Sequence, residues 1–181
     1  SEALIAAGVA KVVYAVADPG PGEGGGAERL RAAGVEVEQG VLADEATEFL
    51  LPWLTATRRR TPSVTVKRAS TLDGRAAAAD GSSQWITGPE ARADGHAWRA
   101  RACAILTGIG TVRDDDPALT VREVRTPRQP LIVVVDRHAE TPPKARVLSG
   151  GNALVVTARD ANPAWPQGVR TLALPDAAGR V

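Results

Sequence analysis

Two arginines, Arg99 and Arg122, have the chemistry needed to bind a small phosphorylated ligand. Arg99 follows the start of an expected helix and Arg122 follows a glycine-containing turn, so both side chains could reach one cleft. A guanidinium carries its N–H donors in a planar fork that matches the oxygens of a phosphate. Taken singly, each arginine is more often a surface residue, so the prediction depends on the pair.

The sequence Gly108-Ile109-Gly110-Thr111 follows an apolar run that is typical of a buried strand. Glycine lets backbone amides approach a ligand closely, and the Thr111 hydroxyl could add a hydrogen bond. The stretch lacks the third glycine of a dinucleotide-binding fingerprint and the Gly-Lys-Ser/Thr of a P-loop. An ordinary tight turn is therefore the simpler prediction for these four residues alone.

The three adjacent carboxylates Asp114–Asp116 carry oxygens of the kind that metals bind. Their charges repel and their side chains point in different directions, so we expect a solvated loop in which one Asp caps the turn at Pro117. Cys103, His96 and His138 do not have the spacing of a zinc site, and Cys103 is expected to be a small core residue. We therefore expect no metal site in this chain.

Lys67 and Trp85 occupy unusual positions. Lys67 interrupts the alternation of an expected strand at 64–70, where it could face a cleft or mark an edge strand. Trp85 lies in a turn just before a helix, for which Thr87 as N-cap and Glu90 as its partner predict a capping box. The indole could offer a flat apolar surface to a ligand, or it could fill a gap between helix and sheet.

Composition excludes several classes of protein. With 181 residues, 44% of them hydrophobic, the chain can bury a core, and we expect a folded, cytoplasmic protein. Its 22 basic and 21 acidic residues argue against a nucleic-acid partner, and the basic run Arg58–Arg60 reads as a solvated linker. No apolar run is long enough for a membrane span, so no membrane partner is expected. The absence of Met indicates a piece of a longer protein.

Hydrophobic periodicity predicts alternating helices and strands, which indicates an α/β fold with parallel strands. In the N-terminal part, helices are expected at 2–8, 27–34 and 44–57 and strands at 11–16 and 35–41. In the C-terminal part, a helix is expected to follow the N-cap Thr87 and to run to about residue 101, and strands are expected at 64–70, 103–108, 130–136 and 153–157. Trp53, next to the helix-interrupting Pro52, is expected to be buried.

The stretches VKRASTLDGR, GSSQWITGPEAR, WRARACAILTGIGTV and DDPALTVR lie within residues 64–122. Together they resemble the reductase half of the bifunctional riboflavin-biosynthesis deaminase/reductase family. The N-terminal stretch SEALIAAGVAKVVYAVADP is similar to the last part of that family's deaminase domain. The resemblance implies a cytidine-deaminase-like α/β remnant at 1–57, a linker at 58–63, and a dihydrofolate-reductase-like α/β domain at 64–181 that is incomplete at its C-terminus.

The resemblance also implies a function, the NADPH-dependent reduction of 5-amino-6-(5-phosphoribosylamino)uracil to its ribitylamino product. Carried over by position, Lys67 would be catalytic and would polarise the reacting sugar. The residues implied to bind the cofactor are Ala69, Trp85, Thr111 and Asp115. Those implied to bind the substrate, a phosphorylated aminopyrimidine, are Ser83, Arg99, Leu119 and Arg122.

Two alternatives remain open. In the first, the native protein is bifunctional, and a zinc-dependent deaminase half precedes Ser1; zinc is expected only in that case. The residues present do not support deamination. That reaction needs a metal to activate water and a Glu to move protons, and the family's zinc-binding motif and this Glu are not found in these residues. In the second, the chain is a non-catalytic fragment that retains both folds. Relatives also suggest a possible homo-oligomer.

Overall fold

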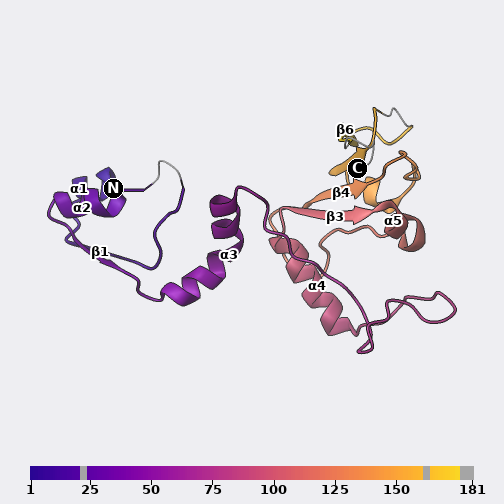
Figure 1. Ribbon diagram of the computed structural model, residues 1–181, viewed down its shortest axis with the longest axis horizontal. Coiled ribbons are helices and arrows are strands. Elements are labelled where there is room, and N and C mark those ends of the chain that lie inside the picture. The colour runs from indigo at the N-terminus through magenta and orange to yellow at the C-terminus, as the bar shows by residue number, and fades with distance from the viewer. Residues whose placement is uncertain (21–23, 161–163, 176–181) are drawn as a thin grey trace. The chain divides into compact units, whose positions relative to one another are not determined.

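The computed structural model describes residues 1–20, 24–160 and 164–175 (Figure 1). The chain divides into two compact units, Ser1–Val66 and Lys67–Val181. Within the described residues, each unit contains its own parallel β-sheet, of two strands in the first and four strands in the second. This mixed α/β architecture confirms the fold class that the sequence predicts.

The first unit alternates helices and strands. Its elements are α1 (Glu2–Ala6), β1 (Lys11–Tyr14), α2 (Gly26–Ala32), β2 (Glu36–Gln39) and α3 (Ala43–Arg59). Strands β1 and β2 pair in parallel, with Lys11 opposite Glu36. The Lys11 ammonium lies 2.9 Å from the Glu36 carboxylate and 2.8 Å from that of Glu38, and these contacts raise its pKa.

Helix α3 differs from the expectation in two respects. It continues to Arg59, so the first residues of the expected linker at 58–63 are helical, with Pro52 inside the helix. Trp53 is 44% exposed, so the prediction that it is buried is wrong. The buried residue is its neighbour Leu54, and successive residues of a helix are turned by about 100° from one another, which points Trp53 away from that contact.

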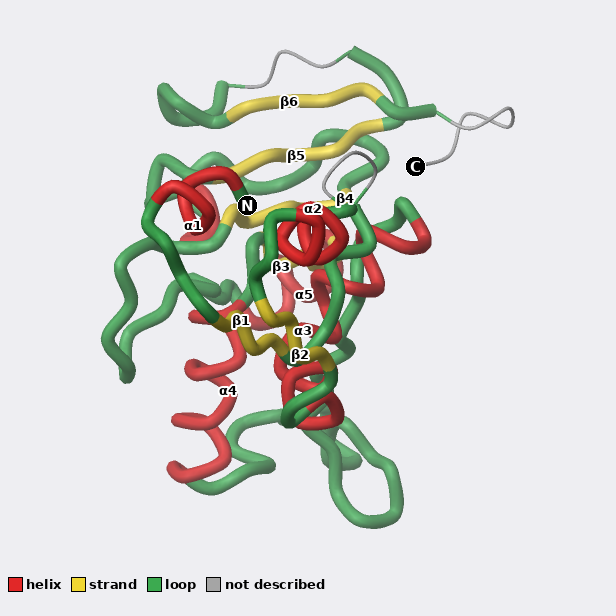
Figure 2. Tube along the Cα trace, turned by 90° about the vertical axis from the view of Figure 1, so that its left-hand side faces the viewer, coloured by secondary structure: helices red, strands yellow, loops and turns green. Residues whose placement is uncertain are grey.

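The second unit is built on strands β3 (Ala104–Gly108), β4 (Leu131–Val135), β5 (Ala153–Thr157) and β6 (Arg170–Ala173). They pair in parallel in the order β3-β4-β5-β6, and β4, β5 and β6 lie side by side in Figure 2. Helices α4 (Pro89–Arg101) and α5 (Ile109–Asp115) and the short 3₁₀ helix η1 (Arg146–Leu148) complete the unit.

The core of the second unit lies on β4 and β5. Val134, Ala153 and Val155 are fully buried there, and Val112 of α5 and Leu148 of η1 pack in the same cluster. β-branched residues are typical of the inner strands of a parallel sheet, where both faces are covered. The core therefore fixes the position of α5, whose exposed side belongs to the candidate site described below.

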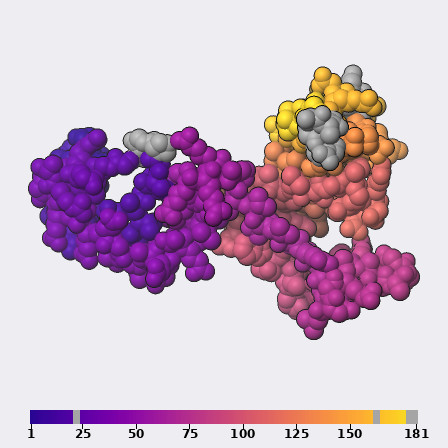
Figure 3. All heavy atoms as spheres, viewed as in Figure 1, coloured from indigo at the N-terminus to yellow at the C-terminus, as the bar shows by residue number. Residues whose placement is uncertain are grey.

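The strand expected at 64–70 is not formed. The backbone of these residues makes no hydrogen bond to another strand within the described part of the chain, and Val64 and Val66 are 80% and 85% exposed. Figure 3 shows the segment at the surface, in purple to magenta. Alternating residues favour a strand only where a neighbouring strand accepts their backbone hydrogen bonds. The alternation alone is therefore not enough to form a strand at 64–70.

The expected capping box of α4 is also absent. The N-cap is Gly88, with no hydrogen bond from a capping side chain. Since the helix begins one residue later than expected, Glu90 stands at the second helical position, and a capping box needs the third. Thr87 instead accepts a hydrogen bond at its carbonyl from Nη1 of Arg92, at 2.7 Å.

The tight turn expected at residues 108–111 is the start of a helix, since Gly108 is the N-cap of α5. Asp114 and Asp115 are exposed, as predicted, but they lie in α5 and not in a loop. Asp116, the C-cap, accepts a hydrogen bond from the backbone amide of Arg146 at 2.8 Å, so it caps η1 and not the Pro117 turn.

Cys103 is exposed, which contradicts the prediction of a core position. It immediately precedes β3, which among the described residues is an edge strand of the sheet and pairs with β4 alone. An edge strand is covered by protein on one side only, which leaves Cys103 in contact with solvent.

Candidate functional site

Arg99 and Arg122 are brought together at Thr120. Nη1 of Arg99, on α4, donates to the carbonyl of Thr120 at 3.4 Å. Nη1 of Arg122 donates to the hydroxyl of the same residue at 3.2 Å. Two guanidinium groups that are 23 positions apart in the sequence therefore meet around one residue.

The electrostatics of this pair favour an anionic ligand. Burial lowers the pKa of Arg99, and the neighbouring charge of Arg122 lowers it further, while Glu123 partly opposes the shift. Arginine stays protonated in proteins, so Arg99 carries its charge in a partly buried position next to Arg122, and Glu123 compensates it only in part. A bound phosphate would place negative charge between the two arginines and relieve this repulsion.

The backbone around Arg122 is held by side chains from two other elements. The Gln129 side chain accepts from the amide of Val121 at 2.8 Å and donates to its carbonyl at 3.0 Å. Nδ1 of His96, on α4, accepts from the amide of Arg122 at 3.2 Å. Leu119 has a φ of 53° and packs against the core cluster, which ties the start of this segment to the sheet.

Ser83 and Asp115 also lie close together. The Ser83 hydroxyl donates to Oδ1 of Asp115 at 3.4 Å, which connects the turn before α4 to the end of α5. A hollow of about 290 Å³ lies here and is lined by Gly81–Gln84, Asp114 and Asp115. Thr111 is exposed one helical turn before Asp115, so it lies near the same side of α5.

Trp85 is 72% exposed, so it does not fill a gap between helix and sheet. The Arg92 guanidinium lies 4.6 Å from the centre of its ring, within the range of a cation–π contact. Because Arg92 also donates to the Thr87 carbonyl, it orients the indole relative to the start of α4. Trp85 lines a second, open hollow of about 510 Å³ together with the turn at 71–75.

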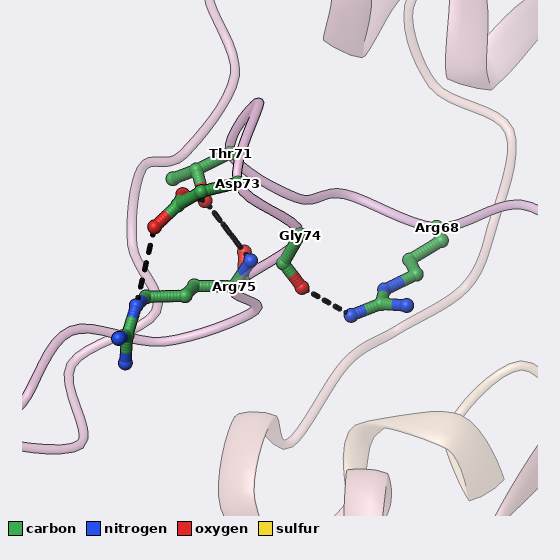
Figure 4. A network of polar contacts seen from close by, with 5 residues as sticks. All are labelled: Arg68, Thr71, Asp73, Gly74 and Arg75. Carbon is green, nitrogen blue, oxygen red and sulfur yellow. Dashed lines mark hydrogen bonds and ion pairs between the residues drawn. The ribbon is translucent and has the colours of Figure 1, made fainter.

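That turn is stabilised by its own side chains, as Figure 4 shows. The Thr71 hydroxyl donates to Asp73 at 2.5 Å, and Nε of Arg75 donates to the other Asp73 oxygen at 3.2 Å. Arg68 donates to the Gly74 carbonyl at 2.6 Å. Gly74 has a φ of 81°, which favours glycine at this position. The network gives the larger hollow an ordered wall.

Lys67 and Ala69 lie in the irregular segment that precedes the turn. Lys67 is exposed and Ala69 is half-buried. Cε of Lys67 lies 3.9 Å from the point where a Cβ on Gly95 would stand, so the lysine runs along α4. Gly95 and Arg99 are four residues apart in this helix and therefore share a face, which places Lys67 on the side of α4 that carries Arg99.

The structure thus groups the predicted residues in three places: Arg99 with Arg122, Ser83 with Thr111 and Asp115, and Lys67 along α4. Trp85 lines the adjoining hollow. Sequence reasoning missed His96, Thr120 and Gln129, which hold the arginine pair. The spacing of three between His96 and Arg99 is the one signal that pointed to a shared helix face.

Among residues 1–20, 24–160 and 164–175, no group of three or more His, Cys, Asp or Glu side chains is arranged to hold a metal ion. No helix in this part of the chain has the length and apolar character to cross a membrane.

The fold and the site define an α/β protein with a parallel sheet and two arginines that converge on one residue, and comparison with known proteins narrows this class. Residues 62–180 match the family described as the RibD C-terminal domain. The riboflavin biosynthesis protein RibD of Mycobacterium tuberculosis (strain H37Rv) is 56% identical over 151 residues, covering 81% of this chain and 44% of that protein. RibD of Escherichia coli K12 is 39% identical over 194 residues, covering 99% and 53%.

A solved structure agrees with these relatives. A diaminohydroxyphosphoribosylaminopyrimidine deaminase/5-amino-6-(5-phosphoribosylamino)uracil reductase from Thermotoga maritima matches with a TM-score of 0.87 and 36% identity, over 98% of this chain and 50% of that one. The chain therefore belongs to the RibD family. It spans about half the length of the curated relatives it matches. The predicted family membership is confirmed.

Proposed function

We propose that this chain carries the reductase activity of riboflavin biosynthesis and reduces 5-amino-6-(5-phosphoribosylamino)uracil with NADPH. The observation that carries the proposal is the convergence of Arg99 and Arg122 on Thr120, which suits the phosphate of such a substrate. Membership of the RibD family supports the reaction, because residues 62–180 match the C-terminal domain.

The substrate would lie between the arginine pair and the Ser83–Asp115 contact. Arg99 and Arg122 would bind the phosphate, while Leu119 and Ser83 would contact the rest of the substrate. Fixing the phosphate at a remote point orients the sugar and reduces the entropic cost of reaching the reactive geometry. Lys67, on the same side of α4 as Arg99, would polarise the reacting sugar by hydrogen bonding.

The residues around the hollows also fit a pyridine nucleotide. Trp85 presents an exposed indole that is oriented by Arg92, which is the kind of flat surface that a nicotinamide or adenine ring packs against. Ala69, Thr111 and Asp115 would complete the cofactor side. When bound, NADPH supplies the hydride that C1′ of the ribose accepts.

We further propose that residues 1–57 belong to a deaminase-like α/β domain, that 58–63 link it to the reductase, and that 64–181 belong to a reductase domain. The boundary between the two compact units, at Val66 and Lys67, supports a division close to this linker.

A transfer experiment with labelled cofactor tests the function. The purified chain is incubated with the aminouracil substrate and NADPH that carries deuterium at C4 of the nicotinamide, and the product is analysed by mass spectrometry. The proposal predicts deuterium at C1′ of a ribityl product. Recovery of unreduced substrate, with the protein folded by circular dichroism, would contradict it.

One observation favours a second candidate, a non-catalytic fragment. Val64, Val66 and Leu72 are exposed in and beside the segment that carries Lys67, so this part of the site lacks the packing of a rigid scaffold. Calorimetric titration with NADPH separates the candidates, because saturable binding supports the reductase and its absence in a folded protein supports the fragment.

A further inference from the structure

His96 is the most deeply buried side chain that touches the arginine pair. It lies on α4 with 4% of its surface exposed, three residues before Arg99. Nδ1 accepts the backbone amide of Arg122 at 3.2 Å, and Nε2 faces the Glu123 carboxylate at 3.8 Å. The imidazole therefore connects α4 to the segment that carries the second arginine.

These contacts define the protonation state of the ring. An imidazole nitrogen that accepts a hydrogen bond has no proton, so Nδ1 must be bare. The single proton of the neutral ring is then on Nε2, where it points toward Glu123. A protonated ring would set two donors against each other, Nδ1–H and the amide of Arg122.

The charges around His96 favour the same state. Burial lowers the pKa of His96, and Arg99 and Arg122 lower it further, while Glu123 raises it. With burial and two arginines against one carboxylate, the neutral ring is the stable form at neutral pH.

We propose that His96 is a positioning residue for the phosphate-binding pair, and that its bare Nδ1 holds the backbone of Arg122 so that both guanidinium groups meet at Thr120. The ligand is a phosphate monoester or inorganic phosphate, which His96 does not touch. This inference rests on the proposed function only in taking the phosphate to be that of the substrate.

Two substitutions distinguish the role of the Nδ1 acceptor from the contribution of side-chain packing at His96. In His96→Asn, the side-chain oxygen can stand close to the position of Nδ1 and accept the amide of Arg122. In His96→Leu, the volume is similar but the acceptor is lost. Because an unsatisfied buried donor is costly, we expect His96→Leu to weaken phosphate binding about tenfold and His96→Asn to change it less than about threefold.

The experiment is a titration of the full chain with inorganic phosphate, followed by ³¹P NMR, for the native protein and both variants. The native protein and His96→Asn should bind phosphate with similar affinity, and His96→Leu should bind it much more weakly. Equal affinity in all three proteins, or equal loss in both variants, would overturn the proposal. Affinity for NADPH should be the same in all three, and a parallel loss of it in His96→Leu would also overturn the proposal.

A measurement on the native chain covers the case in which His96→Leu does not fold. The ¹⁵N shifts of the His96 ring at pH 7 should show a proton on Nε2 and none on Nδ1, and a proton on Nδ1 would overturn the proposal. A phosphate titration that behaves as predicted without any reduction of the aminouracil would leave the role of His96 standing and reject the proposed function.

Discussion

The side chains of Arg99 and Arg122 donate to the carbonyl and the hydroxyl of one residue, Thr120, at 3.4 Å and 3.2 Å. This arrangement places two positive charges side by side, and Glu123 partly opposes their effect. Structures tolerate such a cost where a ligand removes it, so the pair is the strongest support for the phosphate site that we propose.

Replacing Arg99 tests the phosphate assignment. Arg99→Ala should raise KM for the phosphorylated substrate about 10- to 100-fold, because a hydrogen bond to a charged group contributes about 1.5–3 kcal/mol. KM for NADPH should change little. The matched control is Arg101→Ala, which removes an arginine that lies over Trp98 on the same helix and should leave both KM values unchanged. Steady-state kinetics that show equal increases for substrate and cofactor would refute the assignment.

Replacing Trp85 tests the cofactor side. Trp85→Ala should weaken NADPH binding about tenfold, since aromatic packing contributes about 0.5–1.5 kcal/mol beyond buried area. Trp85→Phe keeps a flat ring and should retain most of the affinity. Calorimetric titration with NADPH measures both, and native affinity in Trp85→Ala would show that the exposed indole is not part of the cofactor site.

Replacing Lys67 tests its role in polarising the sugar. Lys67→Gln should lower kcat about 100-fold, as expected when the ammonium that donates to a developing negative charge is replaced by a shorter, neutral amide. KM for NADPH should not change. Lys144→Gln, at an exposed lysine outside the site, is the control. If Lys67→Gln kept the native kcat, Lys67 would not polarise the sugar and would be a surface residue.

The turn in Figure 4 has a predictable pH dependence. The hydrogen bond from Thr71, followed by contacts within the turn and from Arg75, lowers the pKa of Asp73 below its ordinary 3.8. The ionised carboxylate therefore stabilises the turn above pH 3.8, and this contribution is lost as the pH falls through the lowered pKa. NMR titration should show the lowered pKa in the native chain and a return toward 3.8 in Thr71→Val. An unchanged Asp73 pKa in that variant would disprove the contact.

Two leucines of the second unit test the location of the core. Leu148 is 1% exposed, so Leu148→Ala should lower the free energy of unfolding by about 2–5 kcal/mol through loss of burial and creation of a cavity. Leu106, on the edge strand β3, is 69% exposed, and Leu106→Ala should cost less than about 0.5 kcal/mol. If urea denaturation showed similar losses of unfolding free energy in the two variants, the description of the core would be contradicted.

The predicted strands that proved correct share a simple physical basis. β4 and β5 are apolar, β-branched runs, and such runs fold as the inner strands of a parallel sheet wherever helices can cover them. β6 was missed because its sequence, Arg170–Ala173, has polar residues and little burial. The strand expected at 64–70 has the right alternation, but its formation depends on a partner strand that a local pattern does not specify.

Helix ends and buried polar contacts were harder to predict. Gly108 and Gly110 indicated a tight turn, yet Gly108 caps a helix, because glycine suits both structures. The contact of His96 with Arg122 joins a side chain to a backbone amide 26 residues away, and the tertiary fold alone creates it. Residue type and position in the chain singled out the two arginines, the resemblance to a known family implied a substrate role for them, and the structure showed that they meet.

The most direct test of the account compares two substrates that differ only in the phosphate. NADPH oxidation is followed by absorbance with 5-amino-6-(5-phosphoribosylamino)uracil and with the same compound lacking its phosphate, for the native chain and Arg99→Ala. The account predicts oxidation by the native chain that depends on the phosphate, and a much smaller preference in the variant. No oxidation with either compound, or equal oxidation with both by the native chain, would contradict it.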